Sequence, residues 1–177
     1  MERVRDAATV ILVRDCTDGH ADDLEVFVLR RNSTLVFVPG ATVFPGGAVD
    51  PDDRVVAAEL GVDEFRAAAA RECMEESGIP VDPHALIEFA RWITPVGAPR
   101  RYDTRFFVAR APDGHEGVHD GSELVASAWM RPVDALDAFA RGEIDLILPT
   151  QRSLEILARF DRVDALLAEM REAPCPT

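Results

Sequence analysis

Lysine is absent from this sequence of 177 residues, so all 19 basic residues are arginines. A P-loop phosphate site needs a lysine after its glycines, and Schiff-base or pyridoxal phosphate chemistry needs a lysine amine. These classes of site are therefore excluded.

Cysteine and long apolar runs are also scarce. Cys16, Cys73 and Cys175 are widely spaced and form no CxxC pair, which argues against a zinc or thiol redox motif. No stretch approaches the ~20 apolar residues that cross a membrane, and the charged segment 1–6 lacks the apolar run of a signal peptide. We therefore expect a cytoplasmic protein that has no membrane partner and forms one globular domain over residues 1–177.

Positive charge is in short supply, because 32 acidic residues oppose 19 basic ones and give a net charge of −13. Such a chain repels long polyanions, so a long nucleic acid is not expected as a partner. A small anionic ligand remains compatible with this charge, because bound divalent cations reverse the local sign.

Short strand-like segments alternate with a few helical ones along the chain. The alanine-rich run Asp63–Ser77 predicts a helix that Asp63 caps and Gly78 ends. Residues 36–47 suggest two short strands and a glycine loop, and residues 155–169 suggest a helix in which Phe160 is a candidate break. Further strands are expected at 7–14, 24–29, 86–94, 104–109 and 123–130, and a further helix at 132–141. This order predicts an α+β domain, or an α/β/α arrangement with a mixed sheet, rather than a doubly wound one.

Three carboxylates share one face of the predicted helix, since Glu72 stands three and four residues before Glu75 and Glu76. Like charges at this spacing destabilise a helix, whereas grouped carboxylate oxygens suit Mg²⁺ or Mn²⁺. A solvated acidic face is the alternative interpretation. The metal site is favoured by Arg71, which can pair with Glu75, and by Gly46–Gly47, whose backbone can approach a ligand closely.

The segments Phe44–Gly47 and Arg71–Ile79 together resemble the Nudix box, Gly-x5-Glu-x7-Arg-Glu-U-x-Glu-Glu-x-Gly-U, where U is a bulky apolar residue. The second half matches closely, and Cys73 at the first U is a mild change because a buried thiol packs like a small hydrophobe. The stretch between the glycines and the arginine of the box is about ten residues longer here than in the family pattern. Residues 49–59 are therefore expected to enlarge the loop before the helix. Counted back from Arg71, the family's first glutamate falls on Asp63, with Glu64 as the alternative.

The resemblance implies a Nudix-type α/β/α sandwich with a mixed central sheet, in which a metal-activated water attacks one phosphorus of a diphosphate. It also implies that Arg71 orients the glutamates. A carboxylate beyond the box would complete the metal site or act as base, and Glu123 is the candidate, with Asp120 as the alternative. The metal-binding groups implied by the box are the Gly46 carbonyl, Glu72, Glu75 and Glu76. The four histidines show no ligand spacing and suggest surface residues.

Arginine and aromatic side chains gather between the expected strands 86–94 and 104–109. Arginine forks bind phosphate oxygens in pairs, and an aromatic ring can stack on a base. The candidate substrate-binding residues are Arg91, Arg100, Arg101, Tyr102 and Arg105. The alternative is that Trp92, Phe106 and Phe107 belong to the core and only the arginines are exposed.

This arginine-rich stretch and the long loop after the glycines are similar to a Nudix subgroup related to peroxisomal acyl-coenzyme A diphosphatases. The resemblance implies a small diphosphate substrate of the coenzyme A or acyl-CoA class, while ADP-ribose and related nucleoside diphosphate derivatives remain open. A catalytically idle Nudix-fold module that senses nucleotides is the alternative function, and an interaction domain with a solvated acidic helix is a third. The presence of Arg71 and all three glutamates of the box favours the hydrolase. The resemblance also allows a homodimer, because family members often pair through sheet edges or swapped segments, but no residue pattern in this sequence identifies such an edge.

Overall fold

The computed structural model describes residues 4–16, 23–33, 40–119, 121 and 124–172 of the chain. Its strands are β1 (Arg5–Asp15), β2 (Leu24–Arg31), β3 (Ala41–Val43), β4 (Gly46–Ala48), β5 (Ile87–Ile93), β6 (Tyr102–Arg110), β7 (Leu124–Met130) and β8 (Asp145–Leu146). Its helices are α1 (Pro51–Leu60), α2 (Glu64–Ser77), the 3₁₀ turn η1 (Pro83–Ala85), α3 (Pro132–Ala140), α4 (Leu148–Leu157) and α5 (Val163–Glu172). None of the helices in this part of the chain is long and apolar enough to span a bilayer.

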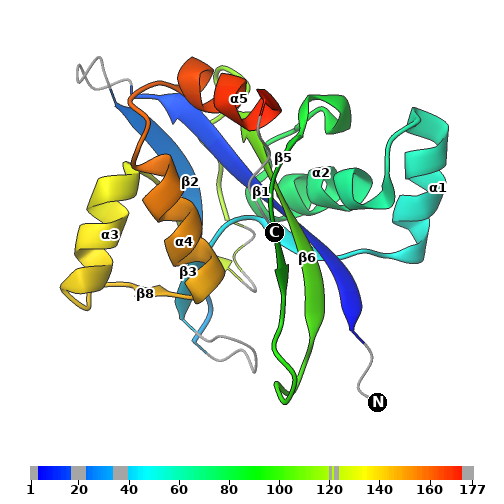
Figure 1. Cartoon of the computed structure of the whole chain (residues 1–177), viewed down its shortest axis with the longest axis horizontal. Helices are drawn as coiled ribbons and strands as arrows, with labels where there is room; N and C mark the ends of the chain where they lie inside the picture. Colours follow the sequence, from blue (N-terminus) through cyan, green and yellow to red (C-terminus); the bar gives the residue numbers. More distant parts are fainter. Residues whose placement is uncertain (1–3, 17–22, 34–39, 120, 122–123, 173–177) are drawn as a thin grey trace.

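The strands form one curled mixed sheet in the order β5-β6-β1-β2-β3-β8 (Figure 1). Strand β4 pairs with β1 and strand β7 pairs with β2. The pairs β1–β6 and β3–β8 are parallel, whereas the others are antiparallel. The mixed sheet predicted from the sequence is therefore confirmed.

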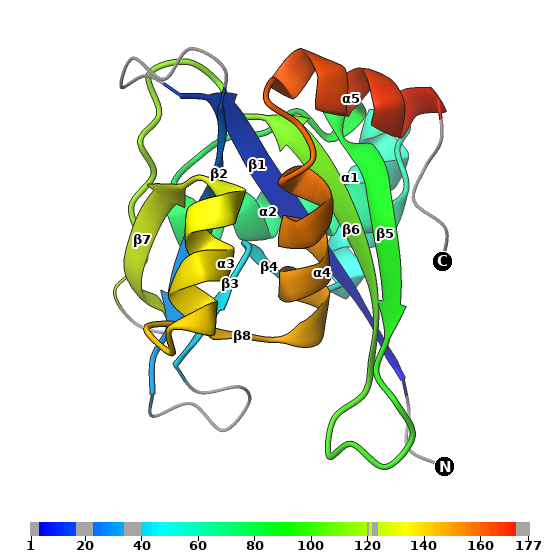
Figure 2. The same cartoon turned by 60° about the vertical axis from the view of Figure 1, so that its left-hand side comes forward.

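Helices cover both faces of this sheet (Figure 2), so the α/β/α layering is also confirmed. Alternate residues of β1 point to opposite faces, as the period of a strand requires. Ile11 and Val13 pack in a core cluster with residues of α4 and α5. Val10 and Leu12 pack in a second cluster with Ala68 and other residues of α2. The sheet is thus buried on both sides, and α2 is held against one of them.

Helix α2 forms where the sequence predicts it. The Asp63 side chain accepts a hydrogen bond from the backbone N–H of Arg66 at 3.0 Å, which satisfies one of the free donors at the helix start. The helix ends at Gly78, whose φ of 68° is left-handed and suits glycine. The small side chains of Ala67–Ala69 are buried, which lets α2 approach the sheet closely.

Two segments around the glycines differ from the sequence expectation. Residues 49–59, expected as an enlarged loop, mostly belong to helix α1, whose N-cap residue Asp50 donates its backbone N–H to the Asp53 carboxylate at 2.7 Å. The expected glycine loop is strand β4, because Gly46 and Gly47 pair with β1. Neither element carries the apolar pattern that reveals strands and helices in a sequence.

The region expected as one helix over residues 155–169 is two helices, α4 and α5. The break lies at residues 158–162, around the candidate Phe160, as predicted. Helix α4 begins earlier than expected, at Leu148, with Pro149 in its first turn, where the missing N–H of proline costs no helical hydrogen bond.

Candidate active site

Strand β4 places the paired glycines directly against α2. Gly46 lies opposite Thr9 of β1, and its N–H donates to Oε2 of Glu76 at 2.9 Å. A Cβ atom on Gly46 would lie 2.5 Å from the backbone oxygen of Ala8, and one on Gly47 would overlap the carboxylate of Glu72. The contact with β1 therefore requires glycine at position 46, and glycine at position 47 lets the Glu72 carboxylate lie directly against β4.

Arg71 joins the box helix to the elements before it. Its Nε and Nη2 donate to the two carboxylate oxygens of Asp53, each at 2.9 Å, and Nη2 also donates to the Ala48 carbonyl at 3.0 Å. Its Nη1 donates to Glu72 at 2.9 Å and to Glu75 at 3.1 Å. The expected pairing of Arg71 with Glu75 is present, and one guanidinium orients two of the three glutamates.

Asp53 is the site residue that the sequence analysis missed. Its side chain is 4% exposed, and it belongs to α1, in the segment expected to be a loop. Counted forward from Gly47, five residues precede Asp53, so it fills the acidic position of Gly-x5-Glu. Counting back from Arg71 gave Asp63 or Glu64 instead, but Asp63 caps α2 and Glu64 is its first residue. The extra residues thus follow the acidic position, and counting forward from the glycines would have shown this.

The charges around Arg71 shift one another's ionisation. The hydrogen bonds that Arg71 donates to Asp53 raise the pKa of Arg71 above its ordinary value, despite the opposing effect of burial. Burial raises the pKa of Asp53, but the bonds and positive charge of Arg71, together with the hydrogen bond from the Asp50 N–H, hold that pKa below its ordinary value. For Glu72, burial dominates and raises the pKa, although Arg71 opposes this effect. A cation near Glu72 would therefore stabilise the charged form of its carboxylate.

The glutamates are held by protein donors. No set of three acidic, histidine or cysteine side chains is gathered at metal-binding geometry within the described ranges. Glu72 and Glu75 bind Arg71, and Glu76 binds the N–H of Gly46. Their oxygens are nevertheless the hard donors that Mg²⁺ takes, on one side of one helix. Glu123 and Asp120, the candidates for a further carboxylate, lie outside the described residues.

The alternation of β4 also orients the Gly46 carbonyl. Val10 N–H donates to the Pro45 carbonyl and Val49 N–H to the Asp6 carbonyl, both at 2.9 Å, so Gly47 exchanges its backbone bonds with β1. The peptide groups of Gly46 then point away from β1, on the side where its N–H meets Glu76. The donor set expected from the sequence is therefore chemically suited to a divalent cation.

Two of the candidate substrate-binding arginines lie on the face of the sheet that carries α2, and each has an interaction partner within the protein. Arg91 donates to both oxygens of Asp103, at 2.8 and 2.5 Å, and these bonds lower the pKa of Asp103. The Arg105 guanidinium lies 4.1 Å from the centre of the Phe65 ring. The positive charge of Arg91 is thus compensated within the protein, and Arg105 makes a cation–π contact.

The remaining candidates lie elsewhere. Arg101 donates through Nε to the Thr94 carbonyl at 3.1 Å, and Arg100 is exposed in the connection between β5 and β6. Tyr102 is half-buried and, by the alternation of β6, faces away from α2. The five candidates are therefore divided between two faces of the sheet and a hairpin.

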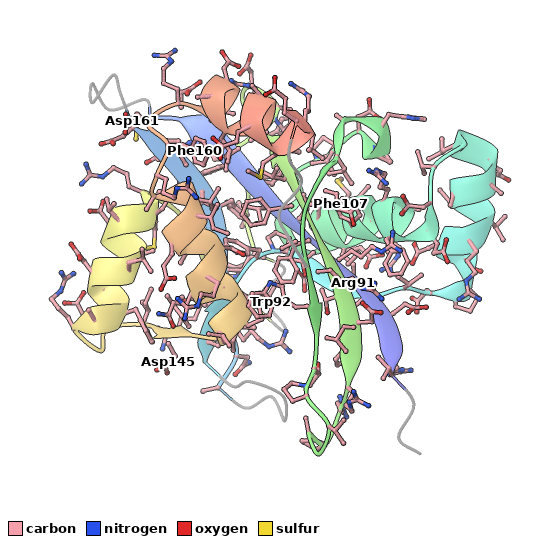
Figure 3. The ribbon with its side chains drawn as sticks, viewed as in Figure 1. Arg91, Trp92, Phe107, Asp145, Phe160 and Asp161 are labelled. Carbon is pink, nitrogen blue, oxygen red and sulfur yellow. The ribbon has the colours of Figure 1, made fainter. Side chains whose placement is uncertain are left out.

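The aromatic residues of this region belong largely to the core. Phe106 and Phe107 are buried on opposite faces of the sheet, and Trp92 packs against the cluster that holds α4 and α5. Figure 3 shows that Arg91 and Trp92, adjacent in β5, point to opposite sides of the sheet. The alternative interpretation of these aromatics as core residues is thus correct.

The histidines agree only in part with their expected surface location. His84 and His115 are exposed, whereas His119 is half-buried, and His20 lies outside the described residues. His119 follows a segment that crosses the end of α2, where Val118 N–H donates to the Ser77 carbonyl at 2.9 Å.

The comparisons with known proteins agree on one family. The model of the NUDIX domain matches residues 4–150. Putative nudix hydrolase 7 of Caenorhabditis elegans is 30% identical over 88% of this chain and 61% of its own length. Acyl-coenzyme A diphosphatase NUDT19 of Gallus gallus is 32% identical over 75% of this chain and 38% of its own length. The chain thus spans less than two thirds of either relative.

Solved structures show the same fold. A NUDIX hydrolase from Alicyclobacillus acidocaldarius superimposes with a TM-score of 0.82 at 27% identity, over 95% of this chain and 97% of that one. The NUDIX domain of Shewanella oneidensis NrtR, solved with ADP ribose, gives a TM-score of 0.63 at 14% identity, over 90% and 88% of the two chains. The second likeness concerns the fold alone.

Proposed function

Because the chain belongs to the Nudix hydrolase family, we propose that it hydrolyses a diphosphate linkage in a nucleoside diphosphate derivative with the help of Mg²⁺ or Mn²⁺. One observation carries this proposal: Arg71 holds Glu72 and Glu75 while β4 holds Glu76. On a surface helix that carries no functional site, water would solvate the glutamates, and we would not expect such a hydrogen-bond network.

The chain's own residues divide the work. Glu72, Glu75 and Glu76, with the Gly46 carbonyl, would hold the cations. Arg71 would keep the carboxylates oriented as they exchange part of their hydrogen bonding for metal coordination. When bound, the metal neutralises phosphate charge and lowers the pKa of a water. Glu123 is our candidate for the base that receives the proton of that water, with Asp120 as the alternative.

Coenzyme A or an acyl-CoA is the substrate class we favour. Its support is the name of two relatives, the acyl-coenzyme A diphosphatases NUDT19 of Gallus gallus and Homo sapiens, at 32% and 30% identity. ADP-ribose is the competing class, supported by the ligand of the NrtR domain, which shares only 14% identity. The cytoplasmic location and the homodimer stay predictions.

Product analysis tests the function. The protein would be incubated with coenzyme A, ADP-ribose, NADH and dinucleoside polyphosphates, with Mg²⁺ or with EDTA, and the phosphate-containing products measured. We expect turnover only with the metal, and a loss of at least about a hundredfold in Glu75→Gln and Glu76→Gln. Glu59→Gln, an exposed glutamate of α1, is the matched control and should keep full activity. Metal-independent turnover, or binding without turnover, would contradict the proposal.

A further inference from the structure

Three arginines gather at one end of the sheet. Arg100 and Arg101 lie in the hairpin between β5 and β6, and the backbone N–H of Arg5, the first residue of β1, donates to the Arg101 carbonyl at 3.0 Å. Arg5 and Arg100 are exposed, and Arg101 is half-buried. Figure 2 shows the start of β1 beside this hairpin, at the end of the sheet that extends beyond the helices. We call Arg5, Arg100 and Arg101 the arginine patch.

The carboxylates next to the arginine patch in the sequence are engaged by other arginines. Asp103 accepts two hydrogen bonds from Arg91, and Asp6 lies 4.0 Å from Arg54. Residues 89–102 contain no acidic residue at all. Within the part of the chain that the structure describes, no member of the patch forms an ion pair. The patch therefore concentrates uncompensated positive charge in a protein whose net charge is −13.

The hairpin that carries the patch is held in place by hydrogen bonds. Thr94 N–H donates to the Tyr102 carbonyl at 2.9 Å, and Tyr102 N–H donates to Oγ1 of Thr94 at 3.1 Å. Nε of Arg101 donates to the Thr94 carbonyl at 3.1 Å, and no described residue accepts a hydrogen bond from its Nη1 or Nη2. The guanidinium is thus fixed by its inner nitrogen while its outer nitrogens face no acceptor. Such preorganisation lowers the entropy cost of binding a ligand.

Strand β1 relates the arginine patch to the site on α2. Gly46 lies opposite Thr9 of β1, and Val49 N–H donates to the Asp6 carbonyl at 2.9 Å. The chain that leaves the paired glycines thus runs along β1 to the residue next to Arg5. Four residues of strand separate Thr9 from Arg5, which corresponds to about 13 Å. A nucleotide with phosphates on both sides of its ribose, together with an extended arginine side chain, can bridge this distance.

We propose that the arginine patch binds a phosphomonoester on the ribose of the substrate, in addition to the diphosphate that is cleaved. The inference rests on the proposed function and names a substrate class within it. This class is the nucleoside diphosphate derivatives that carry the additional phosphate, such as coenzyme A, in preference to those without it, such as ADP-ribose.

Charge and geometry both support this assignment. A phosphomonoester carries a charge of about −1.5 to −2 at neutral pH, and an arginine fork matches the geometry of its oxygens. An acidic protein would repel this group unless fixed positive charge compensated it at the place where it binds. The cations proposed for α2 would serve the diphosphate, so a second phosphate needs its own partner. The arginine patch supplies it without any metal.

Substrates that differ by one phosphate test the patch. Hydrolysis of coenzyme A and of 3′-dephospho-coenzyme A would be measured with Mg²⁺ for the wild type and the double variant Arg100→Gln, Arg101→Gln. We expect a wild-type kcat/KM at least about tenfold higher with coenzyme A, and at least about fivefold of this preference lost in the double variant. NADPH and NADH repeat the comparison for a 2′-phosphate, and show which ribose position the patch recognises.

Single variants keep the test independent of the hydrogen bond to Thr94. Arg5→Gln and Arg100→Gln each change an exposed side chain, so both should unfold at the wild-type temperature. Each should nevertheless reduce the preference for coenzyme A at least about twofold, because each removes one charge from the patch.

A matched double variant removes the same charge elsewhere. Arg141 and Arg159 are exposed and lie after α3 and α4, where their partners are Glu143 and Glu169. Arg141→Gln with Arg159→Gln should keep the wild-type preference within about twofold, because salt screens distant surface charges. The inference is overturned if the wild type hydrolyses both coenzyme A forms equally well, if the patch variants keep the preference, or if this control loses it to the same extent.

Nucleotide binding separates this inference from the proposed function. Adenosine 3′,5′-bisphosphate and AMP would be titrated calorimetrically into the full chain with Mg²⁺ present. If the bisphosphate binds at least about tenfold tighter, and only with Arg100 and Arg101 intact, while nothing is hydrolysed, the inference holds and the catalytic proposal fails. If both coenzyme A forms are hydrolysed with equal kcat/KM and both nucleotides bind equally, the catalytic proposal holds and the inference fails.

Discussion

At the scale of single residues, Arg71 is held on two sides. Asp53 takes two of its nitrogens, and Glu72 and Glu75 share the third. A cation that binds the glutamates can draw them from Nη1 while Asp53 keeps the guanidinium in place. Asp53 thus acts, through Arg71, as a positioning residue for the carboxylates that we propose to bind the metal.

Replacement of this buried partner should be costly. We expect Asp53→Asn to lower the free energy of unfolding at neutral pH by about 2–4 kcal/mol, because it leaves the Arg71 fork without its charged acceptor. Since the folded-state pKa of Asp53 lies below its ordinary value, its contribution is complete above the ordinary pKa and is lost as the pH falls through the folded value. The difference between the two proteins should therefore shrink below about pH 4. Urea unfolding at pH 7 and pH 3 measures it.

Asp63→Asn is the matched control for that experiment. Asp63 is partly exposed, and asparagine caps a helix as well as aspartate does, so this variant should lose less than about 0.5 kcal/mol. Equal losses in the two variants, or a loss in Asp53→Asn that persists at pH 3, would contradict the account of Asp53 as the buried partner of Arg71.

The site residues on α2 could be predicted from the sequence, whereas the residue that holds them in position could not. Arg71, Glu72, Glu75 and Glu76 follow from helical spacing, which fixes neighbours three and four residues apart. Asp53 was not predicted, because the segment between it and Arg71 is longer than in the family pattern, so counting back from Arg71 does not reach it, and helical spacing does not fix a pairing that crosses two helices.

At the scale of elements, the contact between β4 and α2 places the site. The two glycines of β4 meet different obstacles: backbone of β1 for Gly46, and the end of the Glu72 side chain for Gly47. We expect Gly46→Ala to lower the free energy of unfolding by about 2 kcal/mol or more, because the strand must move. In Gly47→Ala the flexible Glu72 side chain can yield, so the fold should persist while metal-dependent activity falls at least about tenfold.

These two variants serve as controls for each other. Chemical denaturation gives their stabilities, and initial rates across a Mg²⁺ titration give the metal requirement. A Gly47→Ala protein with wild-type rates at every Mg²⁺ concentration would show that the position of Glu72 does not matter, and the assignment of Glu72 as a metal ligand would fail.

Most strands could be predicted from the sequence, but β4 and α1 could not, for physical reasons. Alternating apolar side chains reveal β1 and β2, whereas Gly46–Ala48 has almost no side chains to alternate and depends on β1 for its pairing. Helix α1 buries only Asp53 and Ala57 and exposes Val55, so its sequence shows no apolar stripe. An element that positions only backbone groups or a single carboxylate shows little apolar periodicity in its sequence.

At the scale of the whole molecule, the net charge of −13 and the glutamates of α2 lead us to expect that divalent cations stabilise the fold. A cation that binds only the folded chain stabilises it by about 2.7 kcal/mol at a concentration a hundredfold above its dissociation constant. We therefore expect saturating Mg²⁺ to raise the midpoint of thermal unfolding by several degrees over EDTA. Replacing Glu75 and Glu76 together by glutamine should abolish this rise.

The same double variant also tests where the stabilisation comes from. Neutral glutamines remove repulsion between neighbouring carboxylates, so in EDTA the variant should be at least as stable as the wild type. General screening by salt would raise both midpoints equally, and a titration with NaCl at matched ionic strength measures that contribution. If Mg²⁺ stabilised the variant as much as the wild type, the cation would act on the net charge rather than on α2, and the proposed metal site would have to be given up.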